Sequence, residues 1–220
     1  MSTQTKNAKI VPEPSGLYYP NRFARAYFDA MEEVMGRHGL ATLLGYAKLD
    51  HYLNDPPDRS LERNFDFRDI AAMSIALEEM YGARGGRGMA LRIGRAAFAM
   101  NLKDFGIMRG LADSAFQALP LPMRVDFGLQ ALSSLFNNFS DQHCEVETEN
   151  NAYVFNIYNS PMAWNRMAEK PVCHAQVGVI QEGLRWATNG YEFHVMETAC
   201  AATGRDHCTF RINKTAIGEW

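Results

Sequence analysis

Apolar residues recur at helical spacing through the first part of the chain. One apolar stripe predicts a helix over residues 21–38, and residues 40–53 predict a second, shorter helix. Asp66 is suited to cap a third helix, which we expect to end at a flexible glycine-rich connector over 82–88. Further helices are predicted over 89–102, 107–118 and 121–137. The N-terminal half is therefore expected to be helical.

The spacing changes near His143, where apolar and polar residues begin to alternate. The alternation predicts strands over 144–149, 152–158 and 191–198, and a last strand from residue 208. Between them we expect a helix that starts at Ser160 and Pro161, and another over 171–188. This order favours an α+β fold with a helical N-terminal half packed on an antiparallel sheet. We expect one domain over 17–220, preceded by a flexible arm over 1–16.

Composition and charge exclude several classes of protein. The chain has 220 residues, 47% hydrophobic and 21% charged, with a net charge of −3. These values exclude a disordered chain, a collagen and a coiled-coil rod, and they show no basic excess typical of nucleic-acid binders. No apolar run approaches the length of a transmembrane segment, and the polar N-terminus does not resemble a signal peptide. We therefore expect a cytoplasmic protein, in which cysteines are free thiols or metal ligands more often than disulfides.

Three of the four cysteines, Cys173, Cys200 and Cys208, fall in the C-terminal part of the chain. A short loop between two predicted strands brings Cys200 and Cys208 together, and Cys173 lies near the start of a predicted helix. Glu197 shares strand parity with Val195, so its side chain is predicted to face the apolar side of the sheet. A carboxylate is rarely buried there without a partner, and a divalent metal would be one.

Three thiolates and a carboxylate form a closed tetrahedral set that suits structural Zn²⁺. The alternative is that the cysteines are reduced core thiols and Glu197 is exposed. His174 and His207 are rival ligands that could replace Glu197, whereas His194 has the wrong strand parity.

A set of motifs spans residues 155–213. It comprises Pro171-Val172-Cys173-His174, Gly178, Gly183, Val195-Met196-Glu197-Thr198-Ala199-Cys200, Gly204 and Cys208-Thr209-Phe210, with Asn159-Ser160-Pro161 upstream. This set resembles the 4-vinyl reductase domain family. The family includes ligand-sensing domains of aromatic-responsive transcription regulators and proteins named for vinyl reduction in (bacterio)chlorophyll synthesis, and its fold is related to small subunits of vesicle-tethering complexes. The resemblance implies zinc held by Cys173, Glu197, Cys200 and Cys208, which would stabilise a C-terminal hairpin.

We expect the chain to hold a hydrophobic or aromatic ligand, a tetrapyrrole among the candidates, in an internal pocket. Candidate pocket residues, chosen for apolarity and location, are Phe98, Met100, Phe105, Met108, Phe116, Phe127, Phe155, Tyr158 and Trp164. One alternative is a 4-vinyl reductase or an accessory protein of (bacterio)chlorophyll synthesis, but hydride transfer needs a donor cofactor and the sequence shows no nicotinamide or flavin motif. Another is a structural subunit of an assembly.

Three further expectations concern partners and packing. A homodimer is predicted through the apolar stripe of 21–38 and the flanking Tyr18 and Tyr19, and a protein partner is a separate hypothesis. Arginines 84, 87, 92 and 95 would meet acidic groups of a ligand or partner if the segment around 82–88 is more than a connector. Gly178 and Gly183 are expected to let their helix approach the sheet closely.

Overall fold

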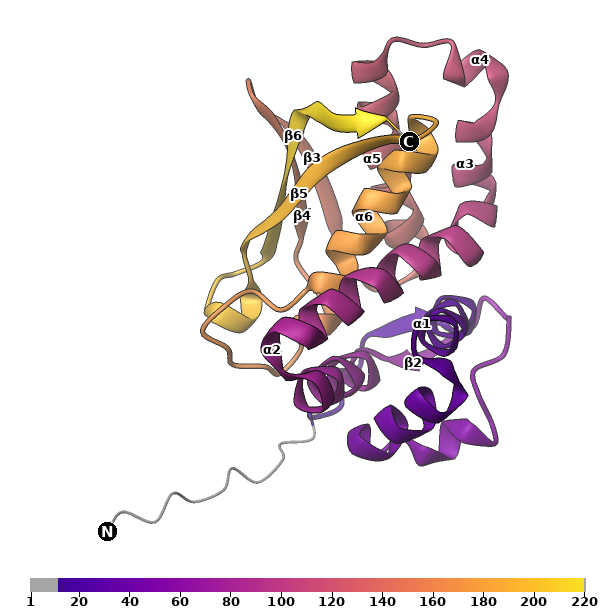
Figure 1. The fold of residues 1–220 in the computed structure, drawn as a ribbon, viewed down its shortest axis with the longest axis vertical. Helices are drawn as coiled ribbons and strands as arrows, with labels where there is room; N and C mark the ends of the chain where they lie inside the picture. Colours follow the sequence, from indigo (N-terminus) through magenta and orange to yellow (C-terminus); the bar gives the residue numbers. More distant parts are fainter. Residues whose placement is uncertain (1–11, 220) are drawn as a thin grey trace.

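Helices and one antiparallel sheet make up the chain in a computed structural model that describes residues 12–219 (Figure 1). The helical part contains β1 (Tyr18–Pro20), α1 (Asn21–Ala47), β2 (Arg63–Asp66), α2 (Phe67–Met100), α3 (Gly106–Arg109), α4 (Ser114–Gln117) and α5 (Leu121–Phe139). The C-terminal part contains β3 (Cys144–Thr148), β4 (Ala152–Ile157), α6 (His174–Ala187), β5 (Tyr191–Ala199) and β6 (Cys208–Glu219). The predicted fold class, a helical N-terminal half with an antiparallel sheet and a C-terminal hairpin, is confirmed.

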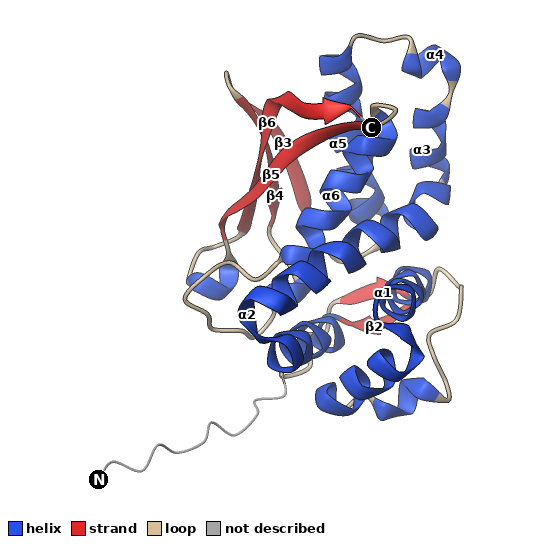
Figure 2. Cartoon of the chain, viewed as in Figure 1, coloured by secondary structure: helices blue, strands red, loops and turns tan. Residues whose placement is uncertain are grey.

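The C-terminal sheet has the strand order β3-β4-β6-β5, and all its neighbours are antiparallel. Helices α5 and α6 lie along one face of it, while α1 and the small β1–β2 sheet form a separate layer below α2 (Figure 2). Inward-facing Phe155, Phe193 and Phe210 are fully buried between the sheet and the helices. Among the described residues, no helix is both long and apolar enough to cross a bilayer.

Two glycines break the long helices, each at a single residue. Gly36 in α1 and Gly82 in α2 have φ of 74° and 70°, a left-handed region that glycine adopts without strain. The helix resumes directly after Gly82, so the prediction of a flexible connector over 82–88 is wrong. Gly86 explains part of this: it is buried, and a Cβ there would lie 2.9 Å from the backbone of Glu78. Tertiary packing therefore outweighs the poor helix propensity of this stretch.

Three other predicted helices differ from the structure. The segment 107–118 is divided into α3, a 3₁₀ turn and α4, because Asp113 caps a new turn by accepting from the Ala115 N–H. After Ser160 only a 3₁₀ turn forms, over Pro161–Ala163. Residues 40–53 divide into the end of α1 and a 3₁₀ turn over Asp50–Leu53.

The β1–β2 sheet was not predicted, and it changes the interpretation of the N-terminal aromatic residues. Tyr19 on β1 is buried, with its ring centroid 5.0 Å from that of Phe67 and 5.7 Å from that of Phe23. Phe28 and Met31 of the apolar stripe are also buried in the chain's own core. The stripe is thus used within one copy and is not left over for a second.

The end of the predicted arm over 1–16 contacts the body of the protein. The Ser15 hydroxyl donates to Asp66 Oδ1 at 2.6 Å, and the Trp164 indole N–H donates to the Glu13 carbonyl at 2.9 Å. Residues 1–11 of the predicted arm lie outside the described residues.

Helix α6 makes its closest approach to α2, and the expectation that its glycines bring it against the sheet is wrong for Gly178. A Cβ at Gly178 would lie 2.1 Å from the Leu91 carbonyl oxygen, and a Cβ at Gly94 would lie 1.9 Å from that of Ala175. The two helices therefore touch backbone to backbone through a glycine on each. At Gly183 a Cβ would lie 3.4 Å from the Phe98 ring, which is ordinary contact.

Candidate metal centre and interior cavity

The four predicted metal ligands come together between the start of α6 and the β5–β6 hairpin. Cys173 is the N-cap of α6, Glu197 lies on β5, Cys200 directly follows β5, and Cys208 begins β6. Their ligand atoms all lie within 4.8 Å of one another, and all four residues are buried. Inward parity places Glu197 there, as the alternation with Val195 predicted.

The sulfur atoms are spaced for a shared cation and not for a disulfide. The Sγ–Sγ distances are 3.5 Å for Cys173–Cys208, 3.7 Å for Cys200–Cys208 and 3.9 Å for Cys173–Cys200. A disulfide would require about 2.05 Å. Four ligands at about 2.3 Å in a tetrahedron lie about 3.8 Å apart. The donor set thus fits a tetrahedral metal such as zinc.

Glu197 carries an unpaired oxygen inside the cluster. Its Oε2 accepts from the Cys173 backbone N–H at 2.8 Å, whereas its Oε1 is buried and has no hydrogen-bond partner among the described residues. Without a cation, burial raises the pKa of Glu197 to about 8 and holds the pKa of the Cys173 thiol well above its usual value. A bound divalent cation would supply the missing partner.

Neighbouring dipoles offset part of the negative charge that such a set would carry. The Ala201 backbone N–H donates to Cys208 Sγ at 3.4 Å, and the Ser160 hydroxyl lies 3.2 Å from Cys173 Sγ. The N-terminus of α6 also points at the cluster, because Cys173 is its N-cap. Neither rival histidine joins the donor group: His174 follows Cys173 on α6, and the His207 ring packs 4.9 Å from that of Tyr158.

The predicted pocket residues do not surround one cavity. Phe98, Phe105, Met108 and Phe155 are buried in the core, Phe116 and Trp164 are partly buried, and Met100, Phe127 and Tyr158 are exposed. Phe98 alone among these nine lines one of the two cavities described below. Of the four arginines, Arg95 forms a bidentate ion pair with Glu192 at 2.6 and 3.0 Å. The side chains of Arg84, Arg87 and Arg92 are exposed.

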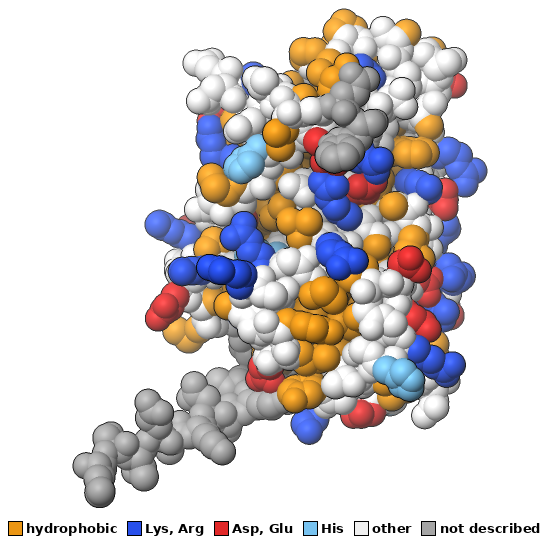
Figure 3. All heavy atoms as spheres, viewed as in Figure 1, with side chains coloured by type: hydrophobic (Ala, Val, Ile, Leu, Met, Phe, Trp, Pro, Cys, Tyr) orange, Lys and Arg blue, Asp and Glu red, His pale blue; other side chains and the backbone are white. Residues whose placement is uncertain are grey.

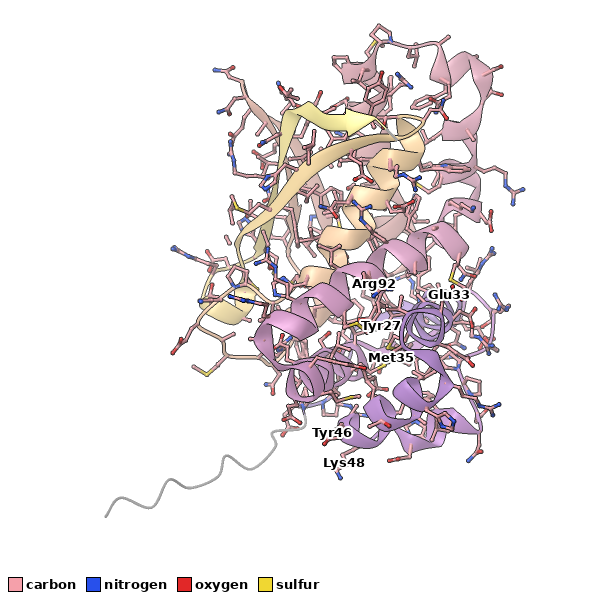
Figure 4. All side chains as sticks on the ribbon, viewed as in Figure 1. Tyr27, Glu33, Met35, Tyr46, Lys48 and Arg92 are labelled. Atoms are coloured by element: carbon pink, nitrogen blue, oxygen red, sulfur yellow. The ribbon has the colours of Figure 1, made fainter. Side chains whose placement is uncertain are left out.

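An interior cavity lies between the N-terminal helices and α5 and α6, and every residue that lines it is buried. The lining consists of Tyr19, Phe23, Ala26, Tyr27, Ile70, Ala97, Leu102, Phe136, Met162, Gln176 and Val179. It leaves about 40 Å³ in which the centre of a water-sized sphere can move, several times what one water needs. Figure 4 shows Tyr27 between α1 and α2.

Sequence reasoning missed this cavity, although one residue signals it. Gln176 lies three and four positions before Val179 and Ile180, on the apolar face of α6, and it is only 2% exposed. A polar side chain on a buried helical stripe is uncommon without a partner. The remaining lining residues come from segments far apart in the sequence, so no local pattern joins them.

A larger cleft opens at the other end of α6. Its volume is about 430 Å³, and Phe98, Lys103, Gln117, Arg185 and Trp186 are among its lining residues. The Lys103 ammonium lies 5.3 Å from the Trp186 ring centroid, and Arg185 pairs with Glu182 at 2.8 Å. This cleft is therefore charged as well as aromatic, in contrast to the interior cavity.

Comparison with known proteins gives a family for the C-terminal part and a fold for the whole. Residues 153–214 match the model of the 4-vinyl reductase domain. An H-NOX protein from S. oneidensis, as a triple mutant in the Fe(II) state, aligns with 14% identity and a TM-score of 0.56 over 91% of this chain and 97% of that chain. An H-NOX protein from the same organism in the Fe(II)NO state gives 13% identity and a TM-score of 0.55 over 88% and 98%.

A vinyl-4-reductase family protein from Methanocaldococcus jannaschii aligns with 19% identity over 59% of this chain and 91% of that chain, at a TM-score of 0.35. That score is too low to support an argument about fold. No curated protein matches the chain. The described residues thus share the fold of H-NOX proteins, at identities too low to transfer a ligand.

Proposed function

Because residues 153–214 belong to the 4-vinyl reductase domain family, we propose that this chain binds a small hydrophobic molecule and that a structural zinc ion stabilises its C-terminal hairpin. The observation that carries the proposal is the interior cavity, whose lining is buried and mostly apolar. Ligand sites are typically apolar hollows with few polar groups. Titles of the structural neighbours name iron-bound NO and heme as ligands of those proteins, which supports a small molecule as the ligand here.

Zinc would be held by Cys173, Glu197, Cys200 and Cys208. The sulfur spacing and the unpaired Glu197 Oε1 support this assignment. The ion would tie the start of α6 to the hairpin and has no part in ligand chemistry, since four protein ligands leave no open position. A cytoplasmic location belongs to the same proposal, because four unpaired cysteines are typical of a reducing compartment.

Heme does not fit the interior cavity of this structure. The cavity is far smaller than a macrocycle, and none of the chain's six histidines lines it. We therefore derive no heme chemistry from the shared fold.

A thermal-shift screen with phenols, polycyclic aromatics and fatty acids tests the proposal. A ligand at a hundred times its Kd should stabilise the native state by about 2.7 kcal/mol. Ala97→Leu, which fills part of the cavity, should abolish the shift, whereas Ala83→Leu on the exposed side of α2 should preserve it. If Ala97→Leu binds as the wild type does, the ligand lies elsewhere.

A tetrapyrrole is the second candidate, and the open cleft near Trp186 is where we would place it. Its volume of about 430 Å³, an aromatic wall and the cations Lys103 and Arg185 suit a flat ring with carboxylates. Absorbance titration with a vinyl chlorin would detect binding. The same titration with NADPH or reduced flavin distinguishes a carrier from a reductase, because only a reductase changes the chromophore with turnover.

Pairing of two copies remains part of the proposal, on a surface other than the stripe predicted from sequence. Figure 3 shows hydrophobic side chains gathered between α1 and α2. In Figure 4, Glu33 of α1 and Arg92 of α2 lie on different sides of Met35. Under twofold symmetry the acidic side of one copy would face the basic side of the other. Met35→Glu should then convert a dimer to a monomer.

A further inference from the structure

Gln176 is a buried side chain whose donor has no partner. It lies on α6, it is 2% exposed, and its Nε2 has no hydrogen-bond partner among the described residues. Its side chain lines the interior cavity. An amide N–H that is unpaired in an apolar interior is costly, so a group that accepts from it would be favoured there.

The cavity's other polar side chains are already engaged. The Tyr19 hydroxyl donates to Gln142 Oε1, and the Tyr27 hydroxyl is hydrogen-bonded to Ser74. The rest of the lining is Phe, Ala, Ile, Leu, Met and Val. The cavity therefore offers a ligand one donor in otherwise apolar surroundings.

A water molecule would be poorly matched to this site. Buried waters typically make two to four hydrogen bonds, and the free Nε2 supplies only one. A charged group would be worse, because the lining contains no charged side chain and burying an unpaired charge is very unfavourable.

We propose that Gln176 orients the cavity's ligand by donating an N–H to it, and that the ligand is a small, uncharged, mostly apolar molecule with one hydrogen-bond acceptor, such as a cyclic or aromatic ketone or aldehyde. The inference rests on the proposed function and names the ligand class of the same cavity. Gln176 then decides which ligand is preferred, while the apolar walls supply affinity that does not discriminate.

The test compares two probes of nearly equal shape, benzaldehyde and styrene, which differ in carbonyl against vinyl. Their Kd values are measured by calorimetry or competition for the wild type, for Gln176→Leu and for Gln181→Leu. Gln181 is on the same helix but outside the cavity lining, so it is the matched control. Zinc content and melting temperature are recorded for each variant, and Gln176→Met replaces Gln176→Leu if that variant does not fold.

We expect the wild type and Gln181→Leu to bind benzaldehyde about five- to tenfold more tightly than styrene, as one net hydrogen bond allows. Gln176→Leu should lose this preference and retain styrene binding. A preference that persists in Gln176→Leu overturns the assignment of the donor. Equal binding of both probes by the wild type overturns the inference but leaves the cavity as a ligand site, whereas binding of neither overturns both.

Discussion

Replacing Gly178 by alanine should separate α6 from α2 and destabilise the protein strongly for such a small change. The new Cβ would lie 2.1 Å from the Leu91 carbonyl oxygen and 2.9 Å from the Arg95 backbone nitrogen. Both atoms belong to the backbone of α2, so no side-chain rotation relieves the clash. Overpacking of this kind costs about 1–3 kcal/mol and occasionally more, partly offset by up to about 1 kcal/mol of improved helix propensity.

Gly183→Ala is the matched control on the same helix. Its Cβ would meet the Phe98 ring at 3.4 Å and Leu132 at 3.6 Å, so the gain in helix propensity is not opposed by a clash. The two variants should differ by about 3 kcal/mol, which corresponds to about 6–12 °C in melting temperature for a chain of this size.

Thermal and urea unfolding of both variants, with zinc content measured in parallel, test the reasoning. Melting temperatures within about 2 °C of each other would show that the helices do not touch at Gly178 as described. A large loss at Gly183 with none at Gly178 would refute the account of the contact altogether.

Three further results are expected. Cys200→Ser should lose the zinc and several kcal/mol of stability because metal binding is coupled to folding, whereas Cys144→Ser, outside the cluster, should keep the zinc; freshly purified wild type without zinc would contradict this. Burial raises the pKa of Tyr27 to about 12, so the folded state retains a proton that the unfolded state loses above its ordinary value of 10; stability should fall as pH rises from 10 to 12, and less steeply in Tyr27→Phe by denaturant titration. Light scattering at micromolar concentration should give twice the 24.8 kDa chain mass for the wild type, and a mass near that of one chain would count against pairing.

The metal cluster could be predicted from sequence because strand alternation and a short loop fix it locally. Glu197 faces inward for the same reason that Val195 does, and the hairpin brings Cys200 and Cys208 together. Only Cys173 required information from beyond the hairpin, and its position at the start of a helix was visible in the sequence.

The interior cavity could not be predicted in this way. Its walls come from β1, α1, α2, α5 and α6, and whether Phe23 and Phe136 leave a gap depends on how these helices pack. The same limit explains the error at 82–88. Local propensity marks all four glycines there as helix breakers, whereas the structure uses a left-handed conformation only at Gly82.

The order of the ligands along the chain has a consequence during protein synthesis. Every residue that lines the interior cavity precedes Cys200, whereas the metal cluster is complete only when Cys208 has been added, 35 residues after Cys173. At about 5–20 residues per second, the Cys173 thiol waits roughly 2–7 s on the ribosome for its last partner. A nascent chain exposed to oxidants in that interval would be vulnerable at Cys173, although the finished protein buries it.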